Sequence, residues 1–340
     1  MRVALLEHFS ALPAGAAPPA LLSAGGALLR AVAADLAALP GVTTEVVAGF
    51  HDGEAGFVKT LRRCDASLVV APEEGGVLER LVRIAGRRRL LLGPGPIAVR
   101  LAADKRATAR RLMERGIAVP GGAVVRRSGA AARLLRFQTP YVVKPRDGCG
   151  CEGVSIVRAP QGVAGALRRI DRVSRRRDLL VEEYVAGEPA SVSFLVSRGR
   201  NGSGTQQILC LGLNRQSVRG KGGPLRYAGG ETPWSHPAAG EAVRLAARAV
   251  RALGHCAGDL CGYVGVDLVL APDGPRVVEI NPRLTTAYLG LRRVARFNLA
   301  GLMLDAALGR RLPRLLEVEG RCSFRPDGSV AVRAGRVAAP

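Results

Sequence analysis

Lysine is scarce in this strongly basic chain. Among 340 residues there are 50 lysines and arginines, but the lysines are only Lys59, Lys105, Lys144 and Lys221. Because arginine serves as the general cation here, a lysine is expected where a compact ammonium group is needed, as on a nucleotide phosphate. Asparagine is equally scarce, so Asn281 is expected to have a specific use.

Aromatic residues are also few, at 4% of the chain. The formal net charge of +22 is a feature of nucleic-acid-binding proteins. However, single-stranded nucleic acids are held by bases stacking on aromatic side chains, and the arginines are spread over the whole chain. We therefore expect no specific nucleic-acid partner, and only non-specific binding to polyanions at low salt.

Signals for secretion, for a membrane span and for zinc are missing too. The first apolar stretch is too short for a signal peptide and reaches Glu7 at once. The most apolar long window, Leu21–Leu39, contains Arg30 and Asp35, which favours a core helix over a membrane span. The seven cysteines follow no zinc-binding spacing and are expected to be free thiols. These absences predict a cytoplasmic protein with no membrane partner.

The first ninety-odd residues alternate between short apolar strands and helices. Strands are expected at Val3–Leu6, Thr44–Val47, Ser67–Val70 and Leu90–Leu92, and helices at Leu21–Leu39, Gly56–Arg63 and Val77–Gly86. This alternation predicts an α/β domain with a small parallel sheet. No Gly-x-Gly-x-x-Gly follows the first strand, so a dinucleotide is not expected. We place a domain boundary at Gly93-Pro-Gly95-Pro.

The rest of the chain is richer in strands. Strands are expected at Tyr141–Lys144, Val154–Val157, Leu179–Val185, Ser191–Val196 and Gln206–Leu213, and helices at Asp104–Gly116, Gln161–Ser174, Ala238–Leu253 and Ala287–Leu308. Asp104 is a suitable N-cap for its helix and Gly116 a suitable end. From Pro313 onwards we expect a tail with one hairpin around Pro326-Asp-Gly328.

Two apolar, β-branched segments lie close together near the C-terminus. They are Val264–Ala271 and Val277–Arg283, and Pro272-Asp-Gly274 separates them. Such a pattern is typical of a β-hairpin closed by a three-residue loop with glycine in the left-handed position.

Within this hairpin, Asp267 is expected to lie directly opposite Glu279, with Asn281 on the same face of the sheet. Two carboxylates that face each other are unfavourable unless a cation lies between them. Oxygen ligands without His or Cys suit Mg²⁺, or Mn²⁺, completed by substrate phosphates. The alternative is a solvated polar face, and the continuation into Pro-Arg283 makes the metal site the better interpretation.

A glycine-rich loop, Arg146-Asp-Gly-Cys-Gly-Cys-Glu-Gly153, follows the strand that ends in Lys144. The backbone N–H groups of such a loop can cover phosphates. It is not a Walker loop, because no Gly-Lys-Ser/Thr ends it and a strand follows it. Taken alone, the loop is also compatible with a simple turn.

The order of these features resembles the ATP-grasp superfamily. Lys105, Lys144 with its loop, the strand Glu182–Val185, and Asp267 with Glu279-Ile-Asn281 occur in the order typical of that superfamily. The resemblance covers roughly residues 100 to 305. Within the superfamily the chain is similar to the carboxylate–amine ligases that include tyramine–glutamate ligase of methanofuran-type cofactor synthesis. The residues behind this closer match are Leu5–Glu7, Lys144–Gly153, Gly187–Ser193 and Glu279–Thr286.

The resemblance implies a fold and a domain organisation. The fold would be α/β (α+β), an ATP-grasp fold behind an N-terminal Rossmann-like pre-ATP-grasp domain. The pre-ATP-grasp domain would occupy residues 1–96 and the ATP-grasp domain residues 97–312, with a lid subdomain at about 117–185. Residues 313–340 would form a C-terminal tail.

The resemblance also implies roles for single residues. The implied ATP-binding residues are Lys105, Lys144, Gly148, Gly150, Gly153, Glu182, Glu183, Tyr184 and Val185. The two lysines would bind phosphates, and the segment Glu182–Val185 would bind adenine, with Glu182 on its exocyclic amine. The implied metal ligands, for two Mg²⁺ ions, are Asp267, Glu279 and Asn281. Arg283, together with Lys144, would act in catalysis by stabilising the transferring phosphoryl group.

Three further features have open interpretations. The family usually places a ribose-binding acid one residue after Glu188, where this chain has Pro189, so Glu188 is either a ribose ligand or a surface carboxylate. Lys221 is either a third phosphate ligand or a loop cation. Tyr227-Ala-Gly-Gly230 either lines the acceptor site or forms a turn.

The reaction implied by the resemblance has two steps. A substrate carboxylate attacks the γ-phosphate of ATP to give an acyl phosphate and ADP, and an amine then displaces phosphate to form an amide. The expected partners are a small-molecule acid and an amine, such as glutamate and tyramine, and the expected assembly is a homodimer. The alternatives are another ATP-grasp amino-acid or peptide ligase, a basic nucleic-acid-binding protein on this scaffold, and an ATP-binding regulatory protein.

Overall fold

The N-terminal part of the protein is a parallel α/β unit. The computed structural model describes residues 1–47, 49, 54–199, 206–220 and 223–334. The strands of this unit are β1 (Arg2–Glu7), β2 (Thr43–Val46), β3 (Ala66–Val70) and β4 (Leu90–Leu91), in the order β2-β1-β3-β4. Its helices are α1 (His8–Ala11), α2 (Pro19–Ala37), α3 (Glu54–Arg62), the 3-10 turn η1 (Glu74–Gly76) and α4 (Val77–Gly86). All strand pairs are parallel, as the alternation of strands and helices predicts.

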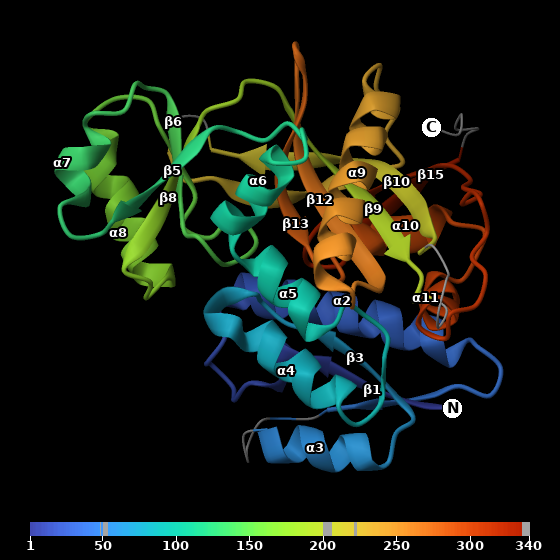
Figure 1. Ribbon diagram of the computed structural model, residues 1–340. Coiled ribbons are helices and arrows are strands. Elements are labelled where there is room, and N and C mark those ends of the chain that lie inside the picture. Colours follow the sequence, from blue (N-terminus) through green and yellow to red (C-terminus); the bar gives the residue numbers. More distant parts are fainter. Residues whose placement is uncertain (48, 50–53, 200–205, 221–222, 335–340) are drawn as a thin grey trace.

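Both faces of this sheet are buried, because successive side chains of a strand point to opposite faces. Val3 and Leu5 pack with α2, whereas Ala4 and Leu6 pack with α3 and α4. In Figure 1 this unit, coloured blue to cyan, lies below the rest of the molecule.

A second unit projects from the body of the protein at the left of Figure 1. Its elements are β5 (Gly122–Arg126), α7 (Ala130–Leu134), β6 (Tyr141–Lys144), β7 (Ser155–Val157), α8 (Gly162–Val173) and β8 (Asp178–Glu183). The strands form an antiparallel sheet in the order β5-β8-β6-β7. Val163, Ala166 and Ile170 form the buried stripe of α8, which packs with this sheet into a small separate core. We refer to residues 122–183 as the lid.

The largest sheet lies in the C-terminal half. Its strands are β9 (Glu188–Val196), β10 (Ile208–Arg219), β11 (Arg226–Thr232), β12 (Gly262–Ala271), β13 (Gly274–Asn281), β14 (Arg321–Phe324) and β15 (Val330–Arg333). They are ordered β13-β12-β9-β10-β11-β14-β15. The helices around it are α5 (Pro96–Ala103), α6 (Lys105–Met113), α9 (Ala239–Ala257), α10 (Ala287–Val294) and α11 (Leu299–Ala307). Strands β14 and β15, which fall in the segment expected to be a tail, therefore extend this sheet.

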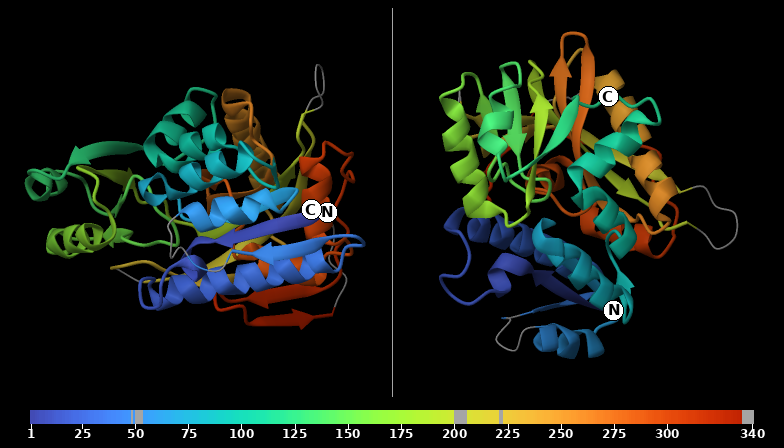
Figure 2. Two further views of the ribbon diagram at one scale, coloured as in Figure 1. Left: turned by 90° about the horizontal axis from the view of Figure 1, so that it is seen from below. Right: turned by 60° about the vertical axis from the view of Figure 1, so that its left-hand side comes forward.

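The two faces of the large sheet belong to different cores. Val192, Phe194 and Val264 pack against α9 on one face. Leu195 and Tyr263 pack on the other face, with α10, α11 and helix α2 of the N-terminal unit. This shared core joins the N-terminal unit to the large sheet, and Figure 2 shows α2 running alongside the C-terminal elements.

Helix α2 is long and apolar enough to cross a membrane by length and composition alone, and it is the one such helix in the described part of the chain. Here it packs against α10 and α11 through the shared core. Asp35 on α2 accepts hydrogen bonds from Tyr288 and Arg292 of α10. The helix therefore serves as a packing surface between the two units.

Two expected elements differ in detail. The segment expected as one helix from Ala287 to Leu308 is two helices, because Ala295 is extended and Asn298 caps α11 by accepting the N–H of Gly301. The hairpin loop has two residues, Pro272 and Asp273, rather than three. A bulge after Asp267 compensates for the shorter loop.

Candidate active site

The carboxylates of the hairpin face each other as predicted. Asp267 of β12 pairs with Glu279 of β13, and the next pair is Leu268 with Val277, so Val278 is the bulged residue. The bulge restores the register that a longer loop would otherwise have set. It thereby keeps both carboxylates on one face of the sheet.

Three side chains hold these carboxylates in place. The side-chain amides of Asn281 and Gln216 donate to the two oxygens of Asp267, at 3.1 and 2.9 Å. The ammonium group of Lys105 lies 3.0 Å from Glu279. Gln216, on β10, was not among the residues selected from the sequence.

The two carboxylates differ in their affinity for protons. Burial and the nearby charge of Glu279 raise the pKa of Asp267. Burial would also raise the pKa of Glu279, but the ammonium groups of Lys105 and Lys144 outweigh it and lower that pKa. The pair therefore tends to keep one proton, which is the expected behaviour of neighbouring carboxylates that lack a cation between them.

The donor set fits Mg²⁺ when phosphate is present. Within the described residues, no group of three or more His, Cys, Asp and Glu side chains could hold a metal. The hairpin supplies two carboxylates and the amide of Asn281, and Mg²⁺ usually takes only one or two carboxylates besides water and substrate phosphates. Burial and the charge of Glu279 both raise the pKa of Asp267, and a divalent cation would offset both effects by favouring the charged carboxylates.

Both predicted phosphate-binding lysines are enclosed and paired with acids. Lys144, at the end of β6, is 3% exposed and lies 2.7 Å from the carboxylate of Glu182 on β8. Lys105, the first residue of α6, also donates to the carbonyl oxygen of Gly148 at 2.8 Å. Burial would lower the pKa of Lys105, but Glu279 and Glu73 outweigh it and raise that pKa. Lys105 is therefore held as a charged, compact cation.

A cavity of about 380 Å³ lies between the lid and the large sheet. The predicted site residues that line it are Lys105, Lys144, Gly148, Glu182, Glu183, Tyr184, Val185, Asp267 and Glu279. These residues come from α6, from the lid and its end, and from the hairpin, and they are separated by up to 174 positions in the sequence. Tertiary structure thus brings both lysines and both carboxylates to one cavity.

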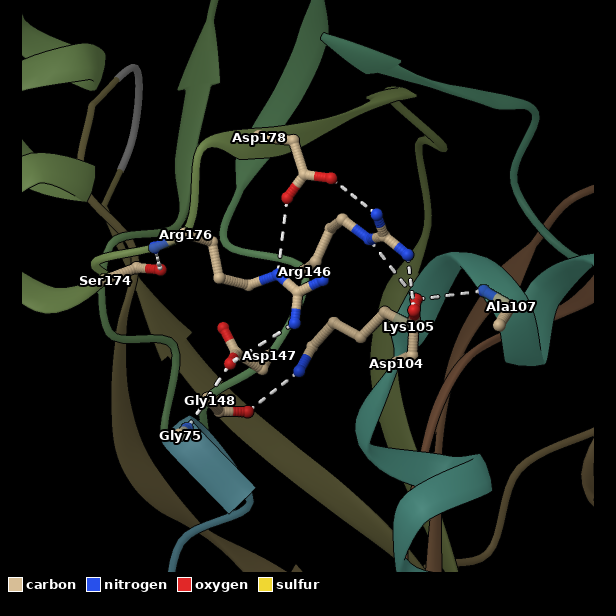
Figure 3. A network of polar contacts seen from close by, with 10 residues as sticks. All are labelled: Gly75, Asp104, Lys105, Ala107, Arg146, Asp147, Gly148, Ser174, Arg176 and Asp178. Carbon is tan, nitrogen blue, oxygen red and sulfur yellow. Dashed lines mark hydrogen bonds and ion pairs between the residues drawn. The ribbon is translucent and has the colours of Figure 1, made fainter. Parts of the chain in front are cut away.

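The glycine-rich loop is anchored at its base by charged contacts, which Figure 3 shows. Arg146 bridges the helix-capping carboxylate of Asp104 and the carboxylate of Asp178 on β8. The carboxylate of Asp147 accepts the N–H of Gly75 at 3.4 Å, which connects the loop to the N-terminal unit. The loop is consequently held between strand β8 of the lid, helix α6 and the turn η1.

Not all loop glycines face the cavity. Gly148 lines the cavity, whereas Gly150 and Gly153 are not among the lining residues in the described part of the chain. Gly153 has a φ of +74°, and a Cβ atom there would lie 2.6 Å from the side chain of Val173. Glycine at this position lets the loop pack closely on α8, and the expected contact of Gly153 with phosphate stays a prediction.

The predicted adenine segment continues beyond its strand. Strand β8 ends at Glu183, whose carboxylate accepts the N–H of Gly121 at 2.9 Å. Tyr184 and Val185 follow outside the strand and line the cavity. Gly187 comes next, and a Cβ atom there would lie 2.4 Å from the carbonyl oxygen of Leu270. Only glycine permits this close approach between the segment and the hairpin.

Arg283 contacts the N-terminal unit. Its Nε donates to Glu73 at 2.9 Å, and one Nη donates to the side-chain oxygen of Asn281 at 3.3 Å. Burial would lower the pKa of Arg283, but the charge of Glu73 outweighs it and raises that pKa. Glu73 was not selected from the sequence, although it follows a buried parallel strand, where ligand-binding residues commonly occur.

Three candidates with open interpretations remain, namely Glu188, Lys221 and Tyr227. Glu188 is half exposed, and its carboxylate lies 3.6 Å from Arg215 and 3.4 Å from His236. Glu188 is absent from the described lining of the cavity, so its geometry corresponds to a surface carboxylate. Lys221 lies outside the described residues. Tyr227 accepts a hydrogen bond from the hydroxyl of Thr286 at 2.8 Å, and burial raises its pKa.

Two cysteines of the glycine-rich loop also line the cavity. Burial raises the pKa of Cys149 to about 11 and that of Cys151 to about 12. Both side chains are therefore neutral thiols near pH 7.

These features define a class of nucleotide-binding proteins, and comparison with known families identifies it. The ATP-grasp domain family matches residues 102–287, which is more than half of the chain, and the pre ATP-grasp 3 domain matches residues 28–99. The chain belongs to the ATP-grasp family. The resemblance noted from the sequence and the predicted fold class are thereby confirmed.

Among named proteins, the chain is similar to ligases. It is 29% identical over 231 residues to tyramine–L-glutamate ligase of Methanocaldococcus jannaschii, covering 67% of this chain and 58% of the relative. It is 31% identical over 252 residues to D-alanine–D-alanine ligase of Syntrophotalea carbinolica, covering 70% of this chain and 74% of the relative. The predicted likeness to tyramine–glutamate ligase is thus confirmed, although the match spans less than two thirds of the Methanocaldococcus jannaschii protein.

Solved structures show the same fold. An ATP-grasp superfamily protein from Archaeoglobus fulgidus superposes with a TM-score of 0.65 at 24% identity, over 96% of this chain and 92% of that chain. N5-carboxyaminoimidazole synthetase from Staphylococcus aureus in complex with ADP superposes with a TM-score of 0.69 at 16% identity, over 95% of this chain and 81% of that chain.

Proposed function

We propose that this protein is an ATP-dependent carboxylate–amine ligase that forms an amide through an acyl phosphate. Its substrates are glutamate and tyramine or a related amine, as in methanofuran-type cofactor synthesis. The observation that carries the proposal is the meeting of Lys105, Lys144, Asp267 and Glu279 at one cavity. The similarity to tyramine–L-glutamate ligase supports the choice of substrates.

Different residues of the cavity bind different parts of ATP. Lys105 and Lys144 bind the phosphates as point charges, and Tyr184 and Val185 lie where the adenine ring binds. Glu182 is paired with Lys144 and positions that lysine. Its carboxylate also accepts a hydrogen bond from the exocyclic amine of adenine. Mg²⁺ held by Asp267, Glu279 and Asn281 would neutralise charge on the β- and γ-phosphates.

The chemical steps need few protein groups. The substrate carboxylate attacks the γ-phosphate, the bond to the β-phosphate oxygen breaks, and ADP leaves. Arg283 stabilises charge on the transferring phosphoryl group. The amine then attacks the acyl carbon, and phosphate leaves. The glycine-rich loop excludes water, which would otherwise hydrolyse the acyl phosphate.

The test is ADP release from ATP with defined substrate pairs. L-Glutamate with tyramine should give ADP and a product with the mass of glutamyl-tyramine, and omission of either substrate should abolish both. Absence of ADP release with glutamate and any of a panel of primary amines would refute the proposal.

A second candidate is a ligase that joins two amino acids. The similarity to D-alanine–D-alanine ligase favours it, because the proposed ATP site serves both reactions equally. D-Alanine pairs and dipeptide-forming mixtures therefore belong in the same panel. Dipeptide product without glutamyl-tyramine would select this candidate.

We further propose that the protein is a cytoplasmic homodimer acting on small molecules. All seven cysteines are free thiols, as expected in a reducing compartment. Light scattering at several protein concentrations tests the dimer, since a constant mass near that of one chain, 35.6 kDa, contradicts it.

A further inference from the structure

We propose that Glu73 forms a binding subsite for the ammonium group of the attacking amine. The inference rests on the proposed function and adds the residue that recognises one substrate. Glu73 lies on the turn after β3, at the carboxyl edge of the N-terminal sheet, and is 5% exposed.

The two carboxylate oxygens of Glu73 have different surroundings. Oε1 accepts the Nε–H of Arg283 at 2.9 Å. Oε2 is buried and has no hydrogen-bond partner among the residues that the structure describes. A buried carboxylate oxygen without a donor is unfavourable, and such groups in folded proteins call for a specific explanation. A ligand that brings N–H donors supplies one.

Glu73 lies next to Arg283, the proposed catalytic residue. Arg283 connects Glu73 to Asn281, one of the proposed metal ligands. The charge of Glu73 also acts on Lys105 and Cys149, both of which line the ATP cavity. The Glu73 carboxylate, through Oε1, is therefore one guanidinium group away from a proposed metal ligand. The attacking amine must bind beside the place where phosphate is transferred.

The local charge selects a cation. The carboxylate of Asp147 accepts the N–H of Gly75 and therefore lies next to the turn that carries Glu73. Oδ1 of Asp147 is a second buried carboxylate oxygen without a partner in the described part of the chain. Oε1 is already paired with Arg283, so the single unpartnered oxygen of Glu73 suits an N–H donor better than a metal ion, which takes several oxygen ligands.

The experiment compares Glu73→Gln with Glu74→Gln in the full chain. Glutamine keeps the size of Glu73 and an acceptor for Arg283, but it removes the charge at Oε2. With tyramine as the probe amine, the KM for tyramine should rise by about 10- to 100-fold in Glu73→Gln, whereas the KM values for ATP and glutamate should change little. Glu74→Gln, which removes an exposed charge from the same turn, should change the KM for tyramine by less than about threefold.

Substrate analogues separate recognition from a structural role. Tyrosol, which carries a hydroxyl where tyramine carries an ammonium group, should bind far more weakly than tyramine to the wild type, and the difference should shrink in Glu73→Gln. A fall in kcat with an unchanged KM for tyramine would mean that Glu73 only positions Arg283, and it would overturn the subsite. A rise confined to the KM for glutamate would overturn it as well.

The subsite can still be tested if the protein does not catalyse the proposed reaction. If no amine gives ADP release, calorimetric titration with tyramine, D-alanine and glutamate in the presence of a non-hydrolysable ATP analogue replaces the kinetics. Weaker binding of tyramine or D-alanine to Glu73→Gln, but not to Glu74→Gln, supports the subsite, whereas weaker binding of glutamate alone overturns it. Equal binding of the amines by the wild type, Glu73→Gln and Glu74→Gln, or no binding by any of them, overturns the subsite. Thermal unfolding of each variant confirms that it is folded.

Discussion

At the residue scale, the opposed carboxylates of Asp267 and Glu279 show how a binding site can cost stability. Burial and the repulsion by Glu279 raise the pKa of Asp267, and hydrogen bonds from Asn281 and Gln216 offset only part of the effect. Ordinary side-chain packing does not explain such a pair. A cation delivered together with phosphates does, because it neutralises both carboxylates at once.

Replacing Asp267 with Asn should separate function from stability. ADP release should fall by about a hundredfold or more, because a proposed metal ligand is lost. The melting temperature should stay equal or rise, since the like-charge repulsion disappears. The same substitution at Asp273, which is exposed in the hairpin loop, is the control and should leave ADP release unchanged. Full ADP release by Asp267→Asn would contradict the metal site.

The scarcity of lysine offers a second test at this scale. Lys144→Arg conserves charge, but a planar guanidinium group cannot occupy the enclosed place of an ammonium group 2.7 Å from Glu182. ADP release should drop strongly, and unfolding should require about 1–3 kcal/mol less free energy because of overpacking. Lys59→Arg, at an exposed position of α3, should change neither quantity. If Lys144→Arg releases ADP at the wild-type rate and has the wild-type free energy of unfolding, the assigned role of Lys144 is wrong.

At the element scale, the glycine-rich loop is held by charge more than by its glycines. Arg146 connects the loop to the N-cap of α6 and to strand β8, and Asp147 connects it to η1. These contacts determine where Gly148 lies relative to Lys105. These contacts hold the base of the loop in place.

The Arg146–Asp178 contact predicts a pH dependence. Burial raises the pKa of Asp178, but hydrogen bonds and the charge of Arg146 outweigh it, so the pKa lies below its ordinary value of 3.8. A carboxyl group with a lowered pKa adds stability above its unfolded-state pKa and loses it as the pH falls through its folded-state pKa. Asp178→Asn should therefore cost about 1–2 kcal/mol at pH 7, and the difference from the wild type should shrink below about pH 4.

Thermal unfolding from pH 7 to pH 3 measures this effect. Asp171→Asn serves as the control, because Asp171 is 62% exposed and pairs with Arg127 at the surface. Its effect should be small at every pH. A difference between Asp178→Asn and the wild type that does not vary with pH would show that the ionic contact contributes nothing.

At the scale of the whole molecule, the N-terminal unit and the large sheet share one hydrophobic core. Asp35 of α2 is the main polar contact within this junction, since it accepts hydrogen bonds from Tyr288 and Arg292. The junction also sets the distance between Glu73 and Arg283, which come from different units. Its rigidity is therefore a condition for the proposed amine subsite.

Asp35→Ala should lower the free energy of unfolding by about 1.5–3 kcal/mol, because it leaves Arg292 and Tyr288 without their acceptor. Asp305→Ala removes an exposed partner of Arg310 and should cost less than about 1 kcal/mol. Urea denaturation measures both. Equal effects of the two substitutions would mean that the junction gains nothing from its buried acceptor.

The sequence by itself determined most of the elements, their order and the opposed pair in the hairpin, but not α5, β5, α7 and β11. Strand and helix periodicity are local properties, and the pairing of Asp267 with Glu279 follows from a hairpin only a few residues long. The predicted three-residue loop was wrong, but the pairing was right, since the bulge at Val278 compensated for the shorter loop. The ATP-grasp family was evident for a similar reason, because its motifs recur in a conserved order along the chain.

Only the tertiary structure decided which side chains meet. Glu73 and Arg283 are 210 residues apart, and no local pattern relates them. The structure also decided that Gly153 packs on α8 and that Glu188 faces Arg215 and His236. The physical reason is that local sequence fixes backbone conformation over a few residues, whereas contacts between units depend on how complete, buried surfaces pack together.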